Sequence, residues 1–117
     1  MTYQRKKLGA EGEDLAKEYL SKKGYKLVKQ NLRLFCGEID LLMEDGDTLV
    51  ICEVKTKTNN AYGEPQEEVD YFKRKKLLQL GKALWQLYPN HSIRIDVVAI
   101  NVENGSVEHF VNAVAEE

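Results

Sequence analysis

The sequence has little of what a secreted or membrane protein requires. It contains two cysteines and two prolines among 117 residues, which argues against a disulfide-stapled secreted scaffold. No run approaches the ~18 apolar residues of a membrane span. The first twelve residues are polar and charged, without the apolar core of a signal peptide. We therefore expect one domain over residues 1–117, cytoplasmic and without a membrane partner.

Several common functional patterns are also missing. The two cysteines and two histidines do not have the spacing of a zinc site. No serine or cysteine has a base at a spacing typical of hydrolases. Tyr62 and Trp85 are isolated aromatics, too few to predict a platform for single-stranded nucleic acid. The candidates that remain are carboxylates and lysines.

The charges are distributed unevenly along the chain. The formal net charge of −2 argues against a nucleic-acid partner when taken alone. Residues 1–35, however, carry nine basic and four acidic side chains, whereas residues 36–70 carry two basic and ten acidic ones, and a cluster of four basic residues follows at 73–76. Such runs can be solvated surface. They also fit an acidic centre that holds a divalent cation, flanked by basic surface that meets phosphate.

Hydrophobic periodicity and turn signals predict two helices and five strands. The expected helices cover residues 11–23 and 70–88, the second capped by Asp70 and buried through Leu77, Leu80, Leu84 and Leu87. The expected strands cover residues 25–28, 38–43, 48–55, 93–100 and 107–111, with a mobile loop at 56–66. The crossover rule makes the strands at 48–55 and 93–100 parallel. The prediction is an α/β three-layer sandwich with a mixed central sheet, in the order α-β-β-β-α-β-β.

The hairpin between residues 38 and 55 gathers acidic side chains. A two-residue Asp-Gly turn at 45–46 would place Glu38 opposite Glu53 and Asp40 diagonal to Glu53. Because side chains alternate with period two, these three acids and Lys55 would project from one face. Opposed carboxylates are destabilising unless a cation relieves them.

These residue types suit metal-assisted hydrolysis of a phosphodiester. Carboxylate oxygens are the ligands that Mg²⁺ or Mn²⁺ prefers. A bound ion lowers the pKa of its water and stabilises developing phosphate charge, and a nearby lysine can place the attacking water. The alternative is that Glu53 and Lys55 form an exposed ion pair at a strand end, worth little to stability.

Asp40, followed after twelve residues by Glu53-Val54-Lys55, resembles the PD-(D/E)xK signature of the restriction-endonuclease-like superfamily, without the preceding proline. A wider set of motifs resembles the YraN-like family of uncharacterised bacterial proteins, which is similar to archaeal Holliday-junction resolvases. The set comprises Gly9-x-x-Gly12-Glu13-x-x-Ala16, Asn31-Leu32-Arg33, Gly37-Glu38-Ile39-Asp40-Leu41-Leu42, Glu53-Val54-Lys55-Thr56, Val69 with Lys73 and Lys76, and Arg94-x-Asp96-Val97-Val98.

The resemblance implies a restriction-endonuclease-like fold and assigns roles. Asp40 and Glu53 would be metal ligands, Lys55 the catalytic lysine, and Glu13 an additional acid that reaches the metal through water or a second ion. From the residues alone, Glu13 is equally explained as a surface acid near a helix start. Lys57 stands where the family often has an arginine. A lysine at this position can still contact phosphate, but it cannot form the bidentate contact that an arginine forms.

Other residues are candidates for supporting roles. Lys73 and Lys76, three residues apart near a helix start, could contact DNA phosphate or be merely solvated. Gln66 is a candidate outer-shell partner of the site, and Glu38 a supporting acid. Arg94 and Asp96 share a strand face and either pair with each other or support the site.

Three functions remain open at this point. The first is a Mg²⁺- or Mn²⁺-dependent endodeoxyribonuclease, directed at DNA that is branched or otherwise structured. The second is a catalytically silent nucleic-acid-binding module on the nuclease fold. The third is a protein-interaction domain in which the acidic side chains serve only as a solvated surface of the hairpin. Resolvase-like relatives act as dimers, so the resemblance also implies a homodimer, although no apolar patch in the sequence identifies an interface.

Overall fold

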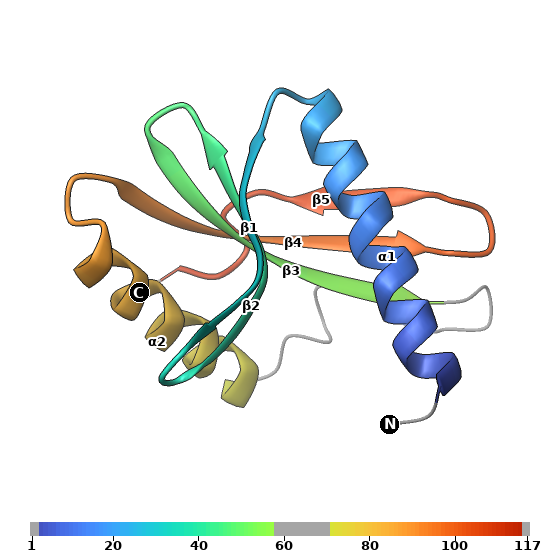
Figure 1. Cartoon of the computed structure of the whole chain (residues 1–117), viewed down its shortest axis with the longest axis horizontal. Helices are drawn as coiled ribbons and strands as arrows, with labels where there is room; N and C mark the ends of the chain where they lie inside the picture. Colours follow the sequence, from blue (N-terminus) through green and yellow to red (C-terminus); the bar gives the residue numbers. More distant parts are fainter. Residues whose placement is uncertain (1–2, 58–70, 116–117) are drawn as a thin grey trace.

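The structure, a computed structural model, describes residues 3–57 and 71–115, with side chains from residue 9 onward. The elements are α1 (Tyr3–Lys22), β1 (Lys26–Leu34), β2 (Gly37–Asp45), β3 (Thr48–Lys57), α2 (Tyr71–Leu87), β4 (Ser92–Asn101) and β5 (Val107–Phe110) (Figure 1). The predicted order α-β-β-β-α-β-β is confirmed. None of the helices in these ranges is long and apolar enough to cross a membrane.

The five strands form one mixed sheet in the order β1-β2-β3-β4-β5. All neighbours are antiparallel except β3 and β4, so the predicted parallel pair is confirmed. Each helix covers its own face of the sheet, with a separate apolar core beneath it. The α1 core contains Ala16, Leu20, Leu41, Met43, Val50, Cys52, Val98 and Ile100. The α2 core contains Ile39, Leu42, Leu49, Ile51, Leu77, Leu80, Leu84, Ile95 and Val114. These three layers match the predicted sandwich.

The second helix buries most of its predicted apolar face. Leu77, Leu80 and Leu84 are buried, and Ala83 joins them. Leu87 was expected in the core but is 61% exposed. It lies on the same side of the helix, one turn beyond the last buried position, so the periodicity continues past the part of the helix that covers the sheet.

Several element boundaries differ from the prediction. Helix α1 begins at Tyr3 and not at the predicted residue 11. The prediction missed this part of the helix because residues 3–10 are mainly polar and show no apolar periodicity. Strand β1 runs to Leu34 because its backbone pairs with β2 along that length, although polar side chains obscure the alternation. Residues 56 and 57 belong to β3 and not to a loop. Gln66 and the predicted cap Asp70 lie outside the described residues.

The register of the β2–β3 hairpin corrects one prediction. Asp45 pairs with Thr48, so the loop residues are Gly46 and Asp47, with Gly46 at φ 61°. Glycine tolerates a positive φ at the first central position of a hairpin turn. A turn at residues 45–46 predicts that Leu42 faces Leu49, whereas Leu42 faces Ile51. The shift is by two residues, which preserves the faces but removes the predicted opposition of residues 38 and 53.

Candidate active site

The site lies where β2 and β3 separate. The described pairs between these strands run from the turn to Leu41 and Cys52. Beyond that point β2 stays paired with β1 and β3 with β4, and the β1–β2 hairpin turns away from β3 (Figure 1). Asp40 and Glu53 are the first residues past the last pair. Extending the register places them directly opposite each other, one on each diverging strand.

Asp40 is held in this opening by the backbone of β3. Its Oδ2 accepts a hydrogen bond from the Val54 amide at 3.3 Å. Burial, together with the negative charge of Glu53, raises the pKa of Asp40 to about 7. Near neutral pH the carboxyl is therefore partly protonated and would gain from a cation.

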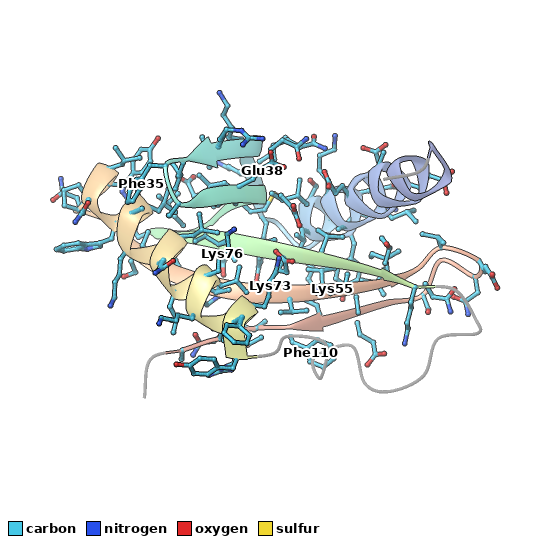
Figure 2. The ribbon with its side chains drawn as sticks, turned by 90° about the horizontal axis from the view of Figure 1, so that it is seen from below. Phe35, Glu38, Lys55, Lys73, Lys76 and Phe110 are labelled. Carbon is cyan, nitrogen blue, oxygen red and sulfur yellow. The ribbon has the colours of Figure 1, made fainter. Side chains whose placement is uncertain are left out.

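Glu53 is buried, with 6% of its surface exposed, and two lysines approach the same oxygen. Lys73 Nζ on α2 lies 2.8 Å from Glu53 Oε1, and Lys55 Nζ on β3 lies 3.8 Å from it. Figure 2 shows Lys76, Lys73 and Lys55 in a row beside the sheet. The contact from Lys73 joins α2 to the site, which the spacing of the sequence did not suggest.

Glu13 approaches the same region from α1, on the other face of the sheet. Gln30 on β1 donates a hydrogen bond to its Oε1 at 3.5 Å. Burial raises the pKa of Glu13, and the carboxylates of Glu38 and Glu53 add to that rise. Glu13 therefore lies near this opening, within the electrostatic reach of both carboxylates. Sequence reasoning missed Gln30, since a polar side chain in a strand does not reveal its partner.

Close packing of α1 on β3 brings Glu13 to the sheet. A Cβ atom added at Gly12 would collide with the side chain of Thr56, so only glycine permits this distance. Gly9, one turn earlier on α1, has no atom within 4 Å of such a Cβ. The sequence motif therefore contains Gly12, but it does not reveal that this glycine permits the close approach of α1 to Thr56 on β3.

The remaining candidates lie at the margins. Glu38 is exposed and accepts a hydrogen bond from Arg33 at 3.4 Å. Lys76 is exposed, with its stem against Gly37, where a Cβ would come within 2.8 Å of Lys76 Cε. Lys57 is half-exposed at the last position of β3. The structure thus gathers Asp40, Glu53, Lys55 and Lys73, with Glu13 facing them.

The donor chemistry of this cluster fits a hard divalent cation. Within residues 3–57 and 71–115, no three His, Cys, Asp or Glu side chains are arranged closely enough to hold a metal ion together. Asp40 and Glu53 alone offer only oxygen atoms, and Mg²⁺ commonly takes one or two carboxylates and keeps several waters. The two carboxylates therefore fit Mg²⁺ or Mn²⁺, with Glu13 outside the set that would touch the ion.

Comparison with known proteins shows where the chain belongs. Residues 12–100 match the family model described as "Uncharacterised protein family UPF0102". The chain belongs to the UPF0102 family. It is 43% identical over 112 residues to a UPF0102 protein of Thermodesulfovibrio yellowstonii, covering 93% of this chain and 96% of that protein. A UPF0102 protein of Persephonella marina is 37% identical, covering 90% of both chains.

Two solved structures share the fold of this UPF0102 chain. An fdxN element excision controlling factor protein from Anabaena variabilis has a TM-score of 0.55 at 12% identity, covering 88% of this chain and 99% of that one. An XisH family protein from Nostoc punctiforme has a TM-score of 0.52 at 11% identity, covering 87% and 99%. At this identity the likeness concerns the fold alone.

A second buried carboxylate in the UPF0102 chain lies on β4, on the α1 face of the sheet. Asp96 is fully buried and accepts hydrogen bonds from Arg94 at 2.9 and 3.1 Å and from the Asn112 amide at 2.9 Å. His109 Nε2 lies 2.7 Å from it. Arg94 also bonds to Tyr25 and Asp45. The predicted pairing of Arg94 with Asp96 is confirmed, and the network joins β2, β4 and β5 to Tyr25, which directly precedes β1.

Proposed function

We propose that this UPF0102 protein is a metal-dependent endonuclease that hydrolyses DNA phosphodiester bonds. The supporting observation is the pair Asp40 and Glu53 on diverging strands, with the Lys55 ammonium 3.8 Å from Glu53 Oε1. A half-buried carboxyl with a pKa raised to about 7 by burial and a like charge is typical of a functional site. Mg²⁺ or Mn²⁺ is the proposed cofactor.

Each side chain has a distinct proposed part. Asp40 and Glu53 would hold the cation, and Lys55 would orient the water that attacks the phosphorus. When bound, the ion would lower the pKa of a coordinated water and stabilise the charge that develops on the phosphate. Glu13, fixed by Gln30, faces the opening from α1, where it can accept a hydrogen bond from water.

The proposed substrate is DNA, structured or branched, that lies across the lysine side of the site. Lys57, Lys73 and Lys76 on β3 and α2 supply positive charge for phosphate, with Lys76 and Lys73 in line with Lys55 (Figure 2). One structural relative is named as an fdxN element excision controlling factor protein, and DNA is the first substrate class to test. We also propose that two copies of the chain associate as a homodimer.

A cleavage assay tests the proposal. Asp40→Asn, Glu53→Gln and Lys55→Met are each expected to lower Mg²⁺- or Mn²⁺-dependent cleavage of a labelled four-way junction by at least about 100-fold. Asp47→Asn is the matched control, because Asp47 is an exposed carboxylate at the hairpin turn. Circular dichroism confirms folding. Cleavage that survives both Asp40→Asn and Glu53→Gln would overturn the mechanism.

The second candidate is a nucleic-acid-binding module without turnover. The close Lys73–Glu53 pair favours it, because the carboxylate already has a counter-charge. This function requires salt-sensitive DNA binding that Lys76→Met weakens and Glu53→Gln preserves. Metal-dependent turnover by purified protein, lost in the Asp40 and Glu53 variants, would reject it.

A further inference from the structure

The contact between Lys73 and Glu53 has a consequence for the order in which the site is filled. Lys73 Nζ lies 2.8 Å from Glu53 Oε1, the shortest ion pair at the site, and Lys55 Nζ approaches the same oxygen. The Glu53 side chain is 8% exposed and that of Lys73 38%. A shielded carboxylate thus faces an ammonium whose long side chain still reaches solvent.

We propose that Lys73 is an exchangeable counter-ion, which occupies the cation position at Glu53 and moves to a DNA phosphate when a divalent ion binds. The inference rests on the proposed metal site. It adds a coupling between metal and DNA binding that the catalytic assignment does not contain.

Charge balance supports the exchange. With both carboxyls ionised, Asp40, Glu53, Lys55 and Lys73 are together neutral, and Glu13 adds one negative charge nearby when it is ionised. A divalent ion would leave this cluster with a net positive charge, which is unfavourable beside a buried Glu53 unless an ammonium leaves or an anion arrives. Lys55 lies on β3, whose backbone is paired with β4 throughout, and stays beside Glu53. Lys73 lies in the first turn of α2, and its side chain can turn outward. A DNA phosphate bound there would draw this ammonium away from Glu53 and would also bring an anion to the site.

Metal titration without DNA is the first test. Calorimetry with Mn²⁺ is carried out on the wild type, Lys73→Met and Lys75→Met. Methionine keeps the aliphatic stem, and Lys75 is an exposed lysine of the same helix that makes the matched change of charge. Lys73→Met is expected to bind Mn²⁺ about fivefold or more tightly than the wild type. Lys75→Met should stay within about twofold, since exposed charges are screened.

The second test measures DNA binding with and without Ca²⁺, which takes the same oxygen ligands. Anisotropy of a fluorescent four-way junction gives the affinities, and a denaturing gel checks that the DNA is intact. Ca²⁺ should tighten DNA binding more in the wild type and Lys75→Met than in Lys73→Met. Coupling of two ligands through one residue requires this reciprocity.

The outcomes separate the two proposals. If none of the three proteins binds Mn²⁺, both the metal site and the exchange are wrong. If all three bind it equally, or Lys73→Met binds it more weakly, the site stands and the exchange is overturned. Thermal unfolding monitors the fold, and Lys73→Gln replaces Lys73→Met if the latter does not fold.

Discussion

Two carboxylates on strands β4 and β2, separated in the sheet by β3, have opposite surroundings. Asp96 receives four hydrogen-bond contacts from two side chains and one backbone amide. Burial alone would raise the pKa of Asp96, but these partners lower it below its usual value. Asp40 receives a contact from the Val54 amide at 3.3 Å, and burial beside Glu53 raises its pKa to about 7.

The difference separates a carboxylate that stabilises the fold from one to which the proposed function assigns a cation. Asp96 has its counter-charge supplied by Arg94, so its ionised form stabilises the folded state. Asp40 faces a like charge instead, so its ionised form is disfavoured. Burial is common to both residues, so the partners decide which role each can have.

The largest expected effect comes from neutralising the two residues in turn. Asp96→Asn removes the charge that balances Arg94 inside the protein, and should lower the free energy of unfolding by about 3–5 kcal/mol. Asp40→Asn removes a charge that is repelled by Glu53, and should leave stability at pH 8 unchanged or higher. Urea unfolding of both variants measures the contrast. Equal losses in the two variants would erase the distinction between them.

A smaller effect is expected from the glycines of α1. Gly12→Ala should cost about 1–3 kcal/mol, because the new methyl collides with Thr56. Gly9→Ala, where the Cβ meets no atom within 4 Å, should stabilise by about 0.5–1 kcal/mol through helix propensity. Thermal unfolding compares them, and Thr56→Ser should rescue Gly12→Ala. Without that rescue, the collision is not the cause of the loss.

The two carboxylates also predict opposite pH trends. For Asp40 the folded pKa of about 7 exceeds the ordinary value of 3.8, so its protonation favours folding and metal-free stability falls as pH rises from about 4 to 7. Asp96, with a lowered pKa, contributes stability above about pH 4 that is lost on acidification. The decline between pH 4 and 7 should be shallower in Asp40→Asn than in wild type. An unchanged decline would assign it to other groups.

The smallest effect is expected at Glu38, an acid outside both clusters. Its pair with Arg33 at 3.4 Å is exposed, so Glu38→Gln should change unfolding by less than about 1 kcal/mol. If Glu38 has only a supporting part, cleavage should fall far less than in Glu53→Gln. A loss of cleavage as large as that of Glu53→Gln would place Glu38 within the site.

The sequence predicts one property of the hairpin better than another. The shared face of Asp40 and Glu53 depends only on parity, and a register shift of two residues preserves it. Which residue lies opposite which depends on the position of the turn, and Gly46 moved the turn by one residue. The predicted parity is therefore compatible with the observed register, whereas the predicted opposition of Glu38 and Glu53 was wrong.

Contacts between layers were beyond the reach of sequence patterns. Lys73 meets Glu53 only because α2 crosses the sheet at that strand, and Glu13 meets Gln30 only because Gly12 lets α1 approach β3. Periodicity identifies which side of a helix is buried, but not where along a strand that helix is placed. The prediction that Leu87 is buried was wrong for the same reason, because its exposure depends on where along α2 the core ends.

The hydrogen bond from the Val54 amide to Asp40 Oδ2 provides a spectroscopic reporter within the site. The amide proton of Val54 points at the carboxyl that changes its protonation near neutral pH, so its NMR resonance should shift with that titration. The same resonance would respond to an ion bound at Asp40. One backbone signal can therefore follow the state of the carboxyl in the unmodified protein, without a substrate, a label or turnover.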